Sequence, residues 1–330
     1  EILDDVSNGS IHCLSGTQAL YQESVSIERL GLVIIDEQHR FGVADRLKLT
    51  AKGTAPHLLM MSATPIPRTL SLALNGDLDT SILDEKPAGR KPVTTRVAPD
   101  SRVDDVMDAV AKAVDRGERV FWICPAVDSE SAEDAAASVR REILAKPVSK
   151  PVALVHGRLP SIDKDAALNA FRTGEAGVLV ATTVVEVGVD VPEATIMVIE
   201  RADKFGLAQL HQLRGRVGRG DKPSSCLLLY KPPLTEGGKN RLEVLRNTED
   251  GFEIAEADFK LRGPGDLLGL RQSGLPAFKV LDLAQDANLL ETARNDARNL
   301  VARDEHFTSE RGLAARLVRD LFAPRIKVET

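Results

Sequence analysis

The chain has few cysteines, and none of them has the spacing of a metal or disulfide site. Among its 330 residues are three cysteines, Cys13, Cys124 and Cys226, which form no C-x-x-C pair. Each lies in an apolar, strand-like run, so we expect reduced thiols in the core rather than metal ligands. No apolar run approaches the length that spans a bilayer, so we expect no membrane partner.

The sequence also lacks a phosphate-binding loop of the form G-x-x-x-x-G-K-S/T. Its Gly238-Lys239 pair is followed by Asn240 and has no glycine at the required upstream position. Such a loop cradles nucleotide phosphates with backbone N–H groups at the start of a helix. We therefore expect that this chain by itself does not hydrolyse ATP.

The charge balance does not indicate a nucleic-acid binder over the whole chain. The formal net charge is −6. Affinity for a phosphate backbone depends on the local field, however, and residues 201–222 carry six basic against two acidic side chains. We expect a basic surface that is confined to this region.

Two adjacent carboxylates follow a short apolar strand predicted over residues 33–35. These are Asp36 and Glu37, and Gln38 and His39 complete the run. Ligands of open α/β sheets bind beyond the carboxyl ends of the strands, where Asp36 can hold Mg²⁺ through water and Glu37 can polarise an attacking water. The alternatives are a solvated strand end and, for a lone histidine, a structural role.

A second strand is predicted over residues 57–61 and leads into Ser62-Ala63-Thr64-Pro65. Small hydroxyl side chains at a strand end, here Ser62 and Thr64, can couple a nucleotide site to a moving interface. We therefore expect these residues to have a coupling role.

The middle of the chain joins an acidic loop to a series of arginines. A predicted strand over 177–181 precedes a loop with Gly188 and Asp190, and a strand over 195–200 precedes a helix with Gln212, Arg216 and Arg219. We expect the last three side chains on one helical face. Arginines suit bidentate contact with phosphate oxygens and stabilise charge on a transferring γ-phosphoryl group. The alternative is a solvated basic helix.

Strands and helices alternate from about residue 102 to residue 230, and the strands are almost continuously apolar. This pattern predicts an α/β fold with a parallel sheet covered on both faces. The run from Lys86 to Pro92 breaks regular structure and is predicted to be a linker. Apolar residues at helical spacing predict two further helices between residues 282 and 322, with a solvated basic face.

Five segments occur in a fixed order: GTQAL from Gly16, DEQH from Asp36, SATPIPRTL from Ser62, VGVD from Val187 and QLRGRVGR from Gln212. In this order they resemble the superfamily-two DNA helicases and translocases, whose motor is a pair of RecA-like domains that clamp ATP between them. SATPIPRTL together with GFEIAEADFKLRGPGDLLGLRQSG, residues 251–274, resembles the RecG family of fork-remodelling helicases. The Mfd family of transcription-repair coupling translocases is the close alternative, although the GLRQSG ending favours the RecG family.

The resemblance implies a domain organisation. Residues 1–85 would be the C-terminal part of the first RecA-like domain, residues 86–232 the complete second one, and residues 233–330 a helical translocation hairpin with C-terminal helices. Because the phosphate loop is missing, the first domain would be incomplete and the chain a fragment of a larger protein.

The resemblance also implies roles for the site residues. ATP and Mg²⁺ would lie between Asp36 and Glu37 on one side and the arginines on the other, with Glu37 as the base or the group that orients water. Arg219 would be the finger that reaches the γ-phosphate, organised by Arg216 and Gln212. The other residues implied in nucleotide binding or coupling are Gln38, His39, Ser62, Thr64, Gly188 and Asp190. Asp190 would contact the ribose or stabilise the loop that senses the nucleotide.

The resemblance also implies a set of residues that bind DNA or drive translocation along it. Sequence-independent contact with DNA phosphates, or translocation through the hairpin, would use Gly16, Thr17, Thr182, Thr183, Arg241, Arg262 and Gln272. For the hairpin the alternative is a simple packing element that closes the edge of the second domain.

The function implied is that of an ATP-dependent DNA helicase that acts on branched duplex DNA in repair and recombination. It would use ATP and Mg²⁺ as a monomer in the bacterial cytoplasm, at the nucleoid, with a single-stranded-DNA-binding protein as a further partner. An Mfd-like translocase, or a non-hydrolysing module for DNA binding or docking, is the alternative. The intact Asp36-Glu37 pair and the two arginines, Arg216 and Arg219, argue against the non-hydrolysing module.

Overall fold

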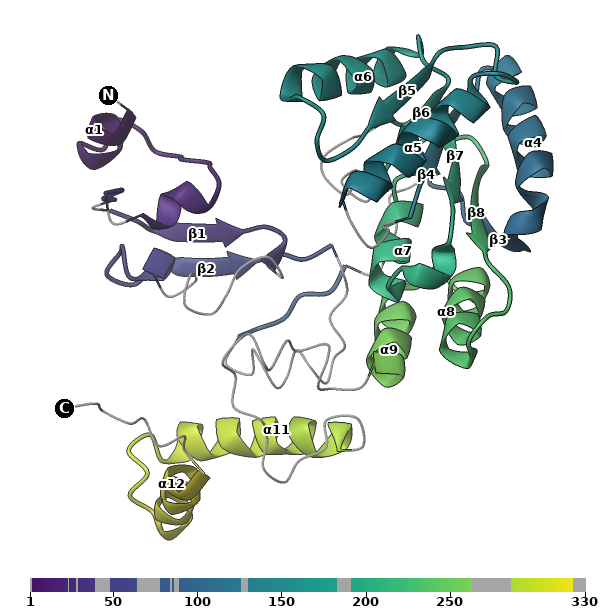
Figure 1. Cartoon of the computed structure of the whole chain (residues 1–330). Helices are drawn as coiled ribbons and strands as arrows, with labels where there is room; N and C mark the ends of the chain where they lie inside the picture. Colours follow the sequence, from purple (N-terminus) through teal and green to yellow (C-terminus); the bar gives the residue numbers. More distant parts are fainter. Residues whose placement is uncertain are drawn as a thin grey trace. The chain divides into compact units, whose positions relative to one another are not determined.

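The structure is a computed structural model of the whole chain (Figure 1). It describes residues 2–22, 24–27, 29–38, 48–63, 78–83, 85, 89–125, 130–182, 191–262 and 286–322. The chain divides into two compact units: the first comprises Glu1–Gly76 and Arg262–Thr330, and the second comprises Asp77–Leu261. Within the described ranges, no helix is both long and apolar enough to cross a membrane.

The second unit is built on a six-stranded sheet in the order β3-β8-β7-β4-β6-β5, with every pair of neighbours parallel. The strands are β3 (Val93–Pro99), β4 (Arg119–Ile123), β5 (Val152–Val155), β6 (Val178–Ala181), β7 (Ala194–Ile199) and β8 (Ser224–Tyr230). The chain winds outward from β4 to β5, returns to β6, and then crosses to β7 on the other side of β4. Such a reversal in winding is where open α/β sheets bind ligands, at the carboxyl ends of the strands.

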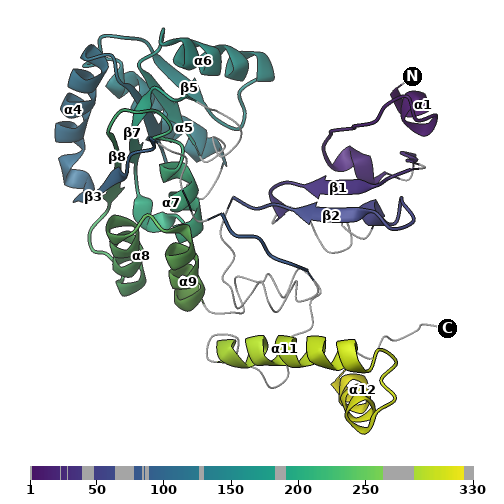
Figure 2. The same cartoon turned by 180° about the vertical axis from the view of Figure 1, so that it is seen from behind.

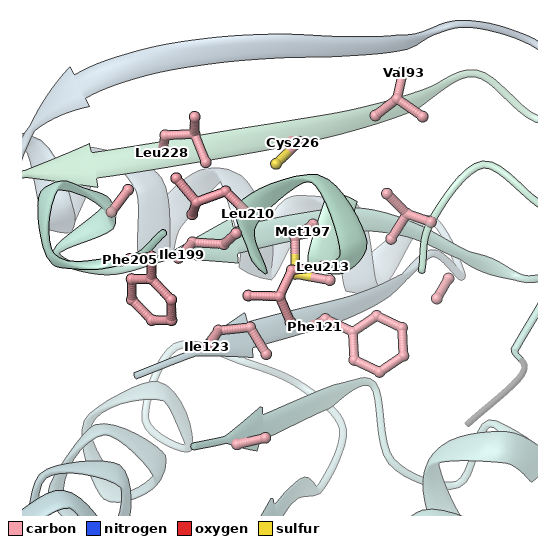
Figure 3. Close-up of a cluster of buried hydrophobic side chains, with 14 of the residues drawn as sticks. Val93, Phe121, Ile123, Met197, Ile199, Phe205, Leu210, Leu213, Cys226 and Leu228 are labelled. Atoms are coloured by element: carbon pink, nitrogen blue, oxygen red, sulfur yellow. The ribbon is translucent and has the colours of Figure 1, made fainter. Parts of the chain in front are cut away.

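Helices cover both faces of this sheet. They are α4 (Val103–Asp115), α5 (Glu130–Leu144), α6 (Ser161–Thr173), α7 (Leu207–Arg214), α8 (Glu236–Asn247) and α9 (Gly251–Arg262). Val120 and Trp122 of β4 pack in the core under α4 and α5, while Phe121 and Ile123 pack with α6, α7 and α8 on the opposite face (Figure 3). This alternation is the period-2 geometry of a strand buried on both sides.

The last two helices of the second unit pack beside α7. In both views α8 and α9 lie side by side next to it (Figures 1 and 2), and Leu242 and Leu245 of α8 belong to the same core as Leu210 and Leu213 of α7. Helix α8 begins after Thr235, whose Oγ1 accepts a hydrogen bond from Gly238 N at 3.1 Å. This N-cap satisfies one of the free N–H groups at the start of the helix.

The first unit contains a much smaller sheet. Its strands β1 (Leu32–Ile35) and β2 (His57–Met60) are parallel and pair Leu32 with His57 through Ile35 with Met60. They follow α1 (Ile2–Ser7) and the 3₁₀ helix η1 (Gln18–Tyr21). Val33 and Ile35 are buried with Leu49, whereas Leu32 and Ile34 are 53% and 55% exposed.

Two helices that lie close to the C-terminus confirm the prediction for residues 282–322. They are α11 (Ala287–Arg303) and α12 (Glu310–Phe322). Asp304 between them accepts hydrogen bonds from the backbone N–H groups of Thr308 at 2.8 Å and Ser309 at 2.9 Å. The hydroxyl of Ser309, followed by these N–H groups, lowers the pKa of Asp304 to about 2.

The alternation of strands and helices predicted for residues 102–230 is confirmed, and the strands predicted over 177–181 and 195–200 are found at Val178–Ala181 and Ala194–Ile199. Strand β3 lies outside the predicted series, and the helix expected to carry Arg216 and Arg219 ends before them. One core prediction was wrong. Cys124 and Cys226 are buried, but Cys13 is exposed, because it lies in an irregular segment between α1 and η1 rather than in a strand.

Candidate functional site: an acidic strand end and an arginine turn

The predicted carboxylates lie at the carboxyl end of β1, in the first unit. Asp36 is exposed, and its Oδ1 accepts a hydrogen bond from the backbone N–H of Glu37 at 2.8 Å. Glu37 is half-buried and has a φ of 52°, a left-handed conformation that a non-glycine residue rarely adopts. Such backbone conformations cluster at functional sites. We call Asp36, Glu37 and Gln38 the acidic strand end.

The structure brings the acidic strand end next to the end of β2. Gln38 N donates to Met61 O at 3.0 Å, and Met61 N donates to Ile35 O at 2.8 Å. Ser62 follows directly and is half-buried. Ser62 therefore follows a strand end that is hydrogen-bonded to the acidic strand end, while His39 and Thr64 lie outside the described residues.

The acidic strand end suits a cation that keeps most of its water. In the described part of the chain, no group of three or more histidine, cysteine or carboxylate side chains is placed to enclose a metal. Mg²⁺ is usually held by one or two carboxylates, several waters and the phosphates of a nucleotide. Among the described residues of the candidate site, Asp36 and Glu37 could hold it.

A hollow of about 1140 Å³ opens beside the acidic strand end. Asp36 lines it together with Gly16 and Thr17, which are both exposed, and with the apolar side chains of Leu32 and Ile34. The structure thus places the GTQAL segment and the acidic strand end around one hollow, although they are twenty residues apart in the sequence.

The arginines of the second unit do not lie on a helix, which corrects the sequence prediction. Helix α7 ends at Arg214, and the chain turns at Gly215 and again at Gly218, which has a φ of 74°. Val217 between them is fully buried, so the turn is drawn into the core instead of continuing the helix. Arg216 and Arg219 therefore follow the helix in a tight turn. We call residues Gly215 to Arg219 the arginine turn.

The arginine turn presents Arg219 to solvent. Its Nε donates to Gly215 O at 3.4 Å, so the side chain folds back over its own turn. Arg216, and Gln212 in the last turn of α7, are half-buried. Gln212 therefore lies on α7, while Arg216 and Arg219 follow it in the turn, so the three residues do not share one helical face.

Arg214 is a further arginine of this segment that the sequence reasoning missed. It is 3% exposed, and its Nη1 donates to Leu245 O at 2.6 Å, Thr248 O at 2.9 Å and Thr95 Oγ1 at 3.3 Å. Burial, above all, lowers its pKa below the usual arginine value. Arg214 therefore ties the end of α7 to the end of α8.

A local signal for the burial of Arg214 is present in the sequence. Leu207, Leu210 and Arg214 are spaced by three and four residues, which places Arg214 on the apolar face of α7. An arginine on an apolar face needs hydrogen-bond acceptors there, and the carbonyls at the end of a neighbouring helix provide them.

The predicted DNA-contacting residues are found in different surroundings. Arg241 of α8 donates to the carbonyls of Asp203 at 3.2 Å and Phe205 at 3.3 Å, around the 3₁₀ helix η5 (Ala202–Lys204). Thr182 is only 1% exposed, so contact between its hydroxyl and a phosphate would require the surrounding chain to move. Thr183, Gly188, Asp190, the side chain of Arg262 and Gln272 lie outside the described residues.

Two family models match the chain. A model for the helicase conserved C-terminal domain matches residues 101–221, and a model described as ATP-dependent DNA helicase RecG, domain 3, C-terminal, matches residues 248–321. The first match covers most of the six-stranded sheet and the arginine turn. Residues 101–221 of the second unit thus have the fold of a helicase C-terminal RecA-like domain.

Individual relatives narrow the class of helicase to which the chain is similar. An ATP-dependent DNA helicase RecG of Synechocystis is 47% identical over 97% of this chain and 39% of that protein. Its counterpart in Escherichia coli K12 is 49% identical over 89% of this chain and 44% of that protein. A solved structure of RecG bound to a three-way DNA junction superposes with a TM-score of 0.65, at 46% identity over 88% of this chain and 37% of that one.

The chain belongs to the RecG family, which confirms the resemblance seen in its motifs and decides against the Mfd family. It spans less than half the length of these relatives.

Proposed function

We propose that this chain is the part of an ATP-driven DNA helicase that supplies the acidic strand end and the arginine turn to one nucleotide site. The observation that carries the proposal is the pair of features itself, in a chain of the RecG family. The exposed Asp36 and the half-buried Glu37 follow strand β1 of the first unit, and the exposed Arg219 lies in a tight turn at the end of α7 in the second. Phosphoryl transfer needs both, because the metal and the arginine each neutralise charge on the transferred group.

In this proposal each residue has a defined task. Asp36 holds Mg²⁺ through water, Glu37 orients or deprotonates the attacking water, and Arg219 contacts the γ-phosphate. Gln212 and Arg216 organise the arginine turn, while Gln38, His39, Ser62, Thr64, Gly188 and Asp190 bind the nucleotide or couple it to movement. The left-handed backbone of Glu37, with a φ of 52°, supports its assignment, since such conformations cluster at functional sites.

The proposed division of labour follows the three regions of the sequence. Residues 1–85 contribute the C-terminal part of the first motor domain and residues 86–232 the second motor domain. Residues 233–330 contribute C-terminal helices and a hairpin that converts closure of the nucleotide site into movement on DNA. Arg214 supports the link between the last two regions, because it joins the end of α7 to the carbonyls of Leu245 and Thr248. Gln272→Ala is expected to retain ATP hydrolysis and to lose unwinding.

The proposed substrate is branched duplex DNA. The relative solved on DNA was bound to a three-way junction, and the same chemistry in this chain would use phosphate contacts that do not depend on sequence. We further propose that the protein works as a monomer in the bacterial cytoplasm near the nucleoid, with a single-stranded-DNA-binding protein as a partner.

The test uses the natural protein in which this sequence occurs. ATP hydrolysis is measured without DNA, with linear duplex and with a three-way junction, together with strand separation on the junction. The proposal predicts the largest stimulation on the junction, with strand separation that requires ATP. Stimulation by linear duplex alone would favour a translocase that does not read branches, and DNA binding without turnover would favour a non-hydrolysing module.

The metal assignment has its own test. Asp36→Asn keeps the shape of the side chain and removes the charge that attracts Mg²⁺. The half-saturating Mg²⁺ concentration for ATP hydrolysis should rise about tenfold in this variant, which corresponds to roughly 1.4 kcal/mol of lost binding. An unchanged Mg²⁺ requirement would contradict the assignment, and Asp79→Asn, outside the acidic strand end, is the matched control.

A further inference from the structure

Arg90, in the segment that leads into β3, lies against the arginine turn. Its Nε donates to Gly218 O at 3.1 Å and its Nη2 donates to Gly215 O at 3.4 Å. The two acceptors are the glycines at which the chain turns before and after Arg216. Although more than a hundred residues separate Arg90 from them in sequence, one guanidinium spans both ends of the turn. Arg90 is half-buried, whereas its neighbour Lys91 is exposed.

The segment that carries Arg90 is itself held in place. Val93, three residues later, begins β3, and its backbone N–H donates to Glu249 Oε1. A Cβ on Gly218 would lie 2.8 Å from Cγ2 of Val93, so the start of β3 packs directly on the turn. The donor and the acceptors of the Arg90 hydrogen bonds thus belong to one packed assembly, which limits the positions the turn can take.

Arg90 and Arg219 share an acceptor. Arg219 Nε donates to Gly215 O at 3.4 Å, the distance at which Arg90 Nη2 reaches the same oxygen. A carbonyl oxygen has two lone pairs and can serve both donors. If Arg219 turns away to bind a phosphate, Gly215 O keeps the hydrogen bond from Arg90, and no acceptor of the turn is left unsatisfied.

We propose that Arg90 is a positioning residue for the arginine turn: it holds the backbone of the turn while Arg219 moves between Gly215 O and the γ-phosphate of ATP. This inference rests on the proposed function for its second half, the contact with the nucleotide. Arg90 touches no reacting atom. Its effect on hydrolysis arises because a turn that is fixed beforehand loses less conformational freedom when Arg219 engages the phosphate.

A purely structural role for Arg90 predicts something different. If it served only to hold β3 on the sheet, its loss would lower the stability of the second unit and leave the properties of the folded protein unchanged. A positioning role predicts that the turn loosens within a folded unit. It also predicts that kcat falls while the KM for ATP stays nearly constant, because the interaction with the γ-phosphate develops in the transition state.

The first experiment measures the turn without any ATP hydrolysis. Backbone amide exchange is followed by NMR in the natural protein, as wild type and as Arg90→Gln, Arg90→Lys and the control Lys91→Gln. Arg216 N and Val217 N are the reporters, because they donate to Leu213 O and Arg214 O within the turn. Exchange at both should be about tenfold faster in Arg90→Gln and intermediate in Arg90→Lys, whose single ammonium replaces only part of the fork.

Lys91→Gln should leave exchange in the turn unchanged, and amides of β4 should be unaffected in every variant. Equal exchange of the turn in Arg90→Gln and wild type would overturn the inference, as would faster exchange throughout the second unit. This result stands whether or not the protein hydrolyses ATP, so failure of the inference and failure of the proposed function are distinguishable.

The second experiment compares ATP hydrolysis by the same proteins on branched DNA. Arg90→Gln should lower kcat by about tenfold with a KM for ATP within about twofold of wild type, and Arg90→Lys should recover part of the loss. An unchanged kcat in a protein whose turn exchanges faster would show that the turn need not be held, which would contradict the proposal. A wild type without ATP hydrolysis would instead refute the proposed function.

Discussion

The two units bury their strands very differently. In the second unit, β4 and β6 have side chains buried on both faces of the sheet, under α4 and α5 on one side and α6, α7 and α8 on the other. In the first unit, β1 alternates between exposed and buried side chains, and its exposed set is as apolar as its buried set. The runs LVII of β1 and VLVA of β6 look alike as sequences. Their different burial teaches that an apolar run predicts a strand, while only the surrounding elements decide how many of its faces are covered.

Truncating one side chain in each sheet is the strongest test of this difference in burial between the units. Phe121 of β4 is fully buried, and its ring lies 4.9 Å from that of Phe171. Phe121→Ala should lower the free energy of unfolding of the second unit by about 4 kcal/mol, because it removes apolar contact and leaves a cavity. Ile34→Ala on the exposed face of β1 should change stability by less than about 0.5 kcal/mol.

Urea unfolding followed by circular dichroism measures both variants. Equal losses would show that the apolar face of β1 is covered in solution and would remove the contrast between the units. A loss of less than about 1 kcal/mol for Phe121→Ala would show that the core around β4 is not close-packed.

Substitution of Arg214 tests whether buried hydrogen bonds also stabilise the second unit. Arg214→Met keeps the length of the side chain but leaves the carbonyls of Leu245 and Thr248 without their donor. We expect a loss of about 3 kcal/mol, the range found when a buried charge-assisted network is broken. Fluorescence of Trp122, the single tryptophan of the chain, follows unfolding of this unit directly.

The matched control for Arg214 is Arg246→Met, on the exposed side of α8. Its Nε donates to Oδ1 of the neighbouring Asn247 at 3.4 Å, and the change should stay within about 0.5 kcal/mol. If the two variants lose the same stability, the hydrogen bonds of Arg214 do not link α7 to α8 in solution.

The cysteines test the difference in burial between the two units at single side chains. Burial raises the pKa of Cys226 to about 12 and that of Cys124 further still, whereas Cys13 of the first unit is exposed. Thiolates are the reactive form. At pH 8 a thiol reagent should therefore label one cysteine in the folded chain and all three after unfolding.

The raised pKa values of Cys124 and Cys226 determine how these thiols change the stability of the folded chain with pH. Both groups are held neutral in the folded chain, so the stability they contribute is present below their ordinary pKa of 9.0 and is lost as the pH rises toward about 12. Rapid labelling of Cys226 in the folded chain at pH 8 would contradict the buried position of β8.

Local patterns predicted most of the fold. The alternation of apolar strands with helices sets the parallel sheet, and the adjacency of Asp36 to Ser62 follows because parallel strands end at the same edge. The end of α7 was predicted wrongly, although Gly215 and Gly218 are the kind of residues that interrupt a helix. The spacing of Gln212, Arg216 and Arg219 suits a helical face, but the helix ends at Arg214, before the two glycines.

Long-range contacts were beyond the sequence. Nothing near Arg90 shows that it contacts Gly215 and Gly218, because that contact depends on β3 and β8 becoming neighbours in the sheet. The exposure of Cys13 likewise depends on its segment remaining irregular, which an apolar neighbourhood does not reveal. Tertiary packing decides both, and packing has no local period.

The most direct test of the account asks whether the acidic strand end and the arginine turn act on one phosphoryl group. ATP hydrolysis at saturating ATP and branched DNA is measured for the natural protein as wild type, Glu37→Gln, Arg219→Ala and the double variant. Each single change should lower kcat by about a thousandfold or more, and the double variant should be no slower than the slower single one, since residues that act in one step do not add. Losses that multiply in the double variant, or a single variant with the wild-type rate, would contradict the account.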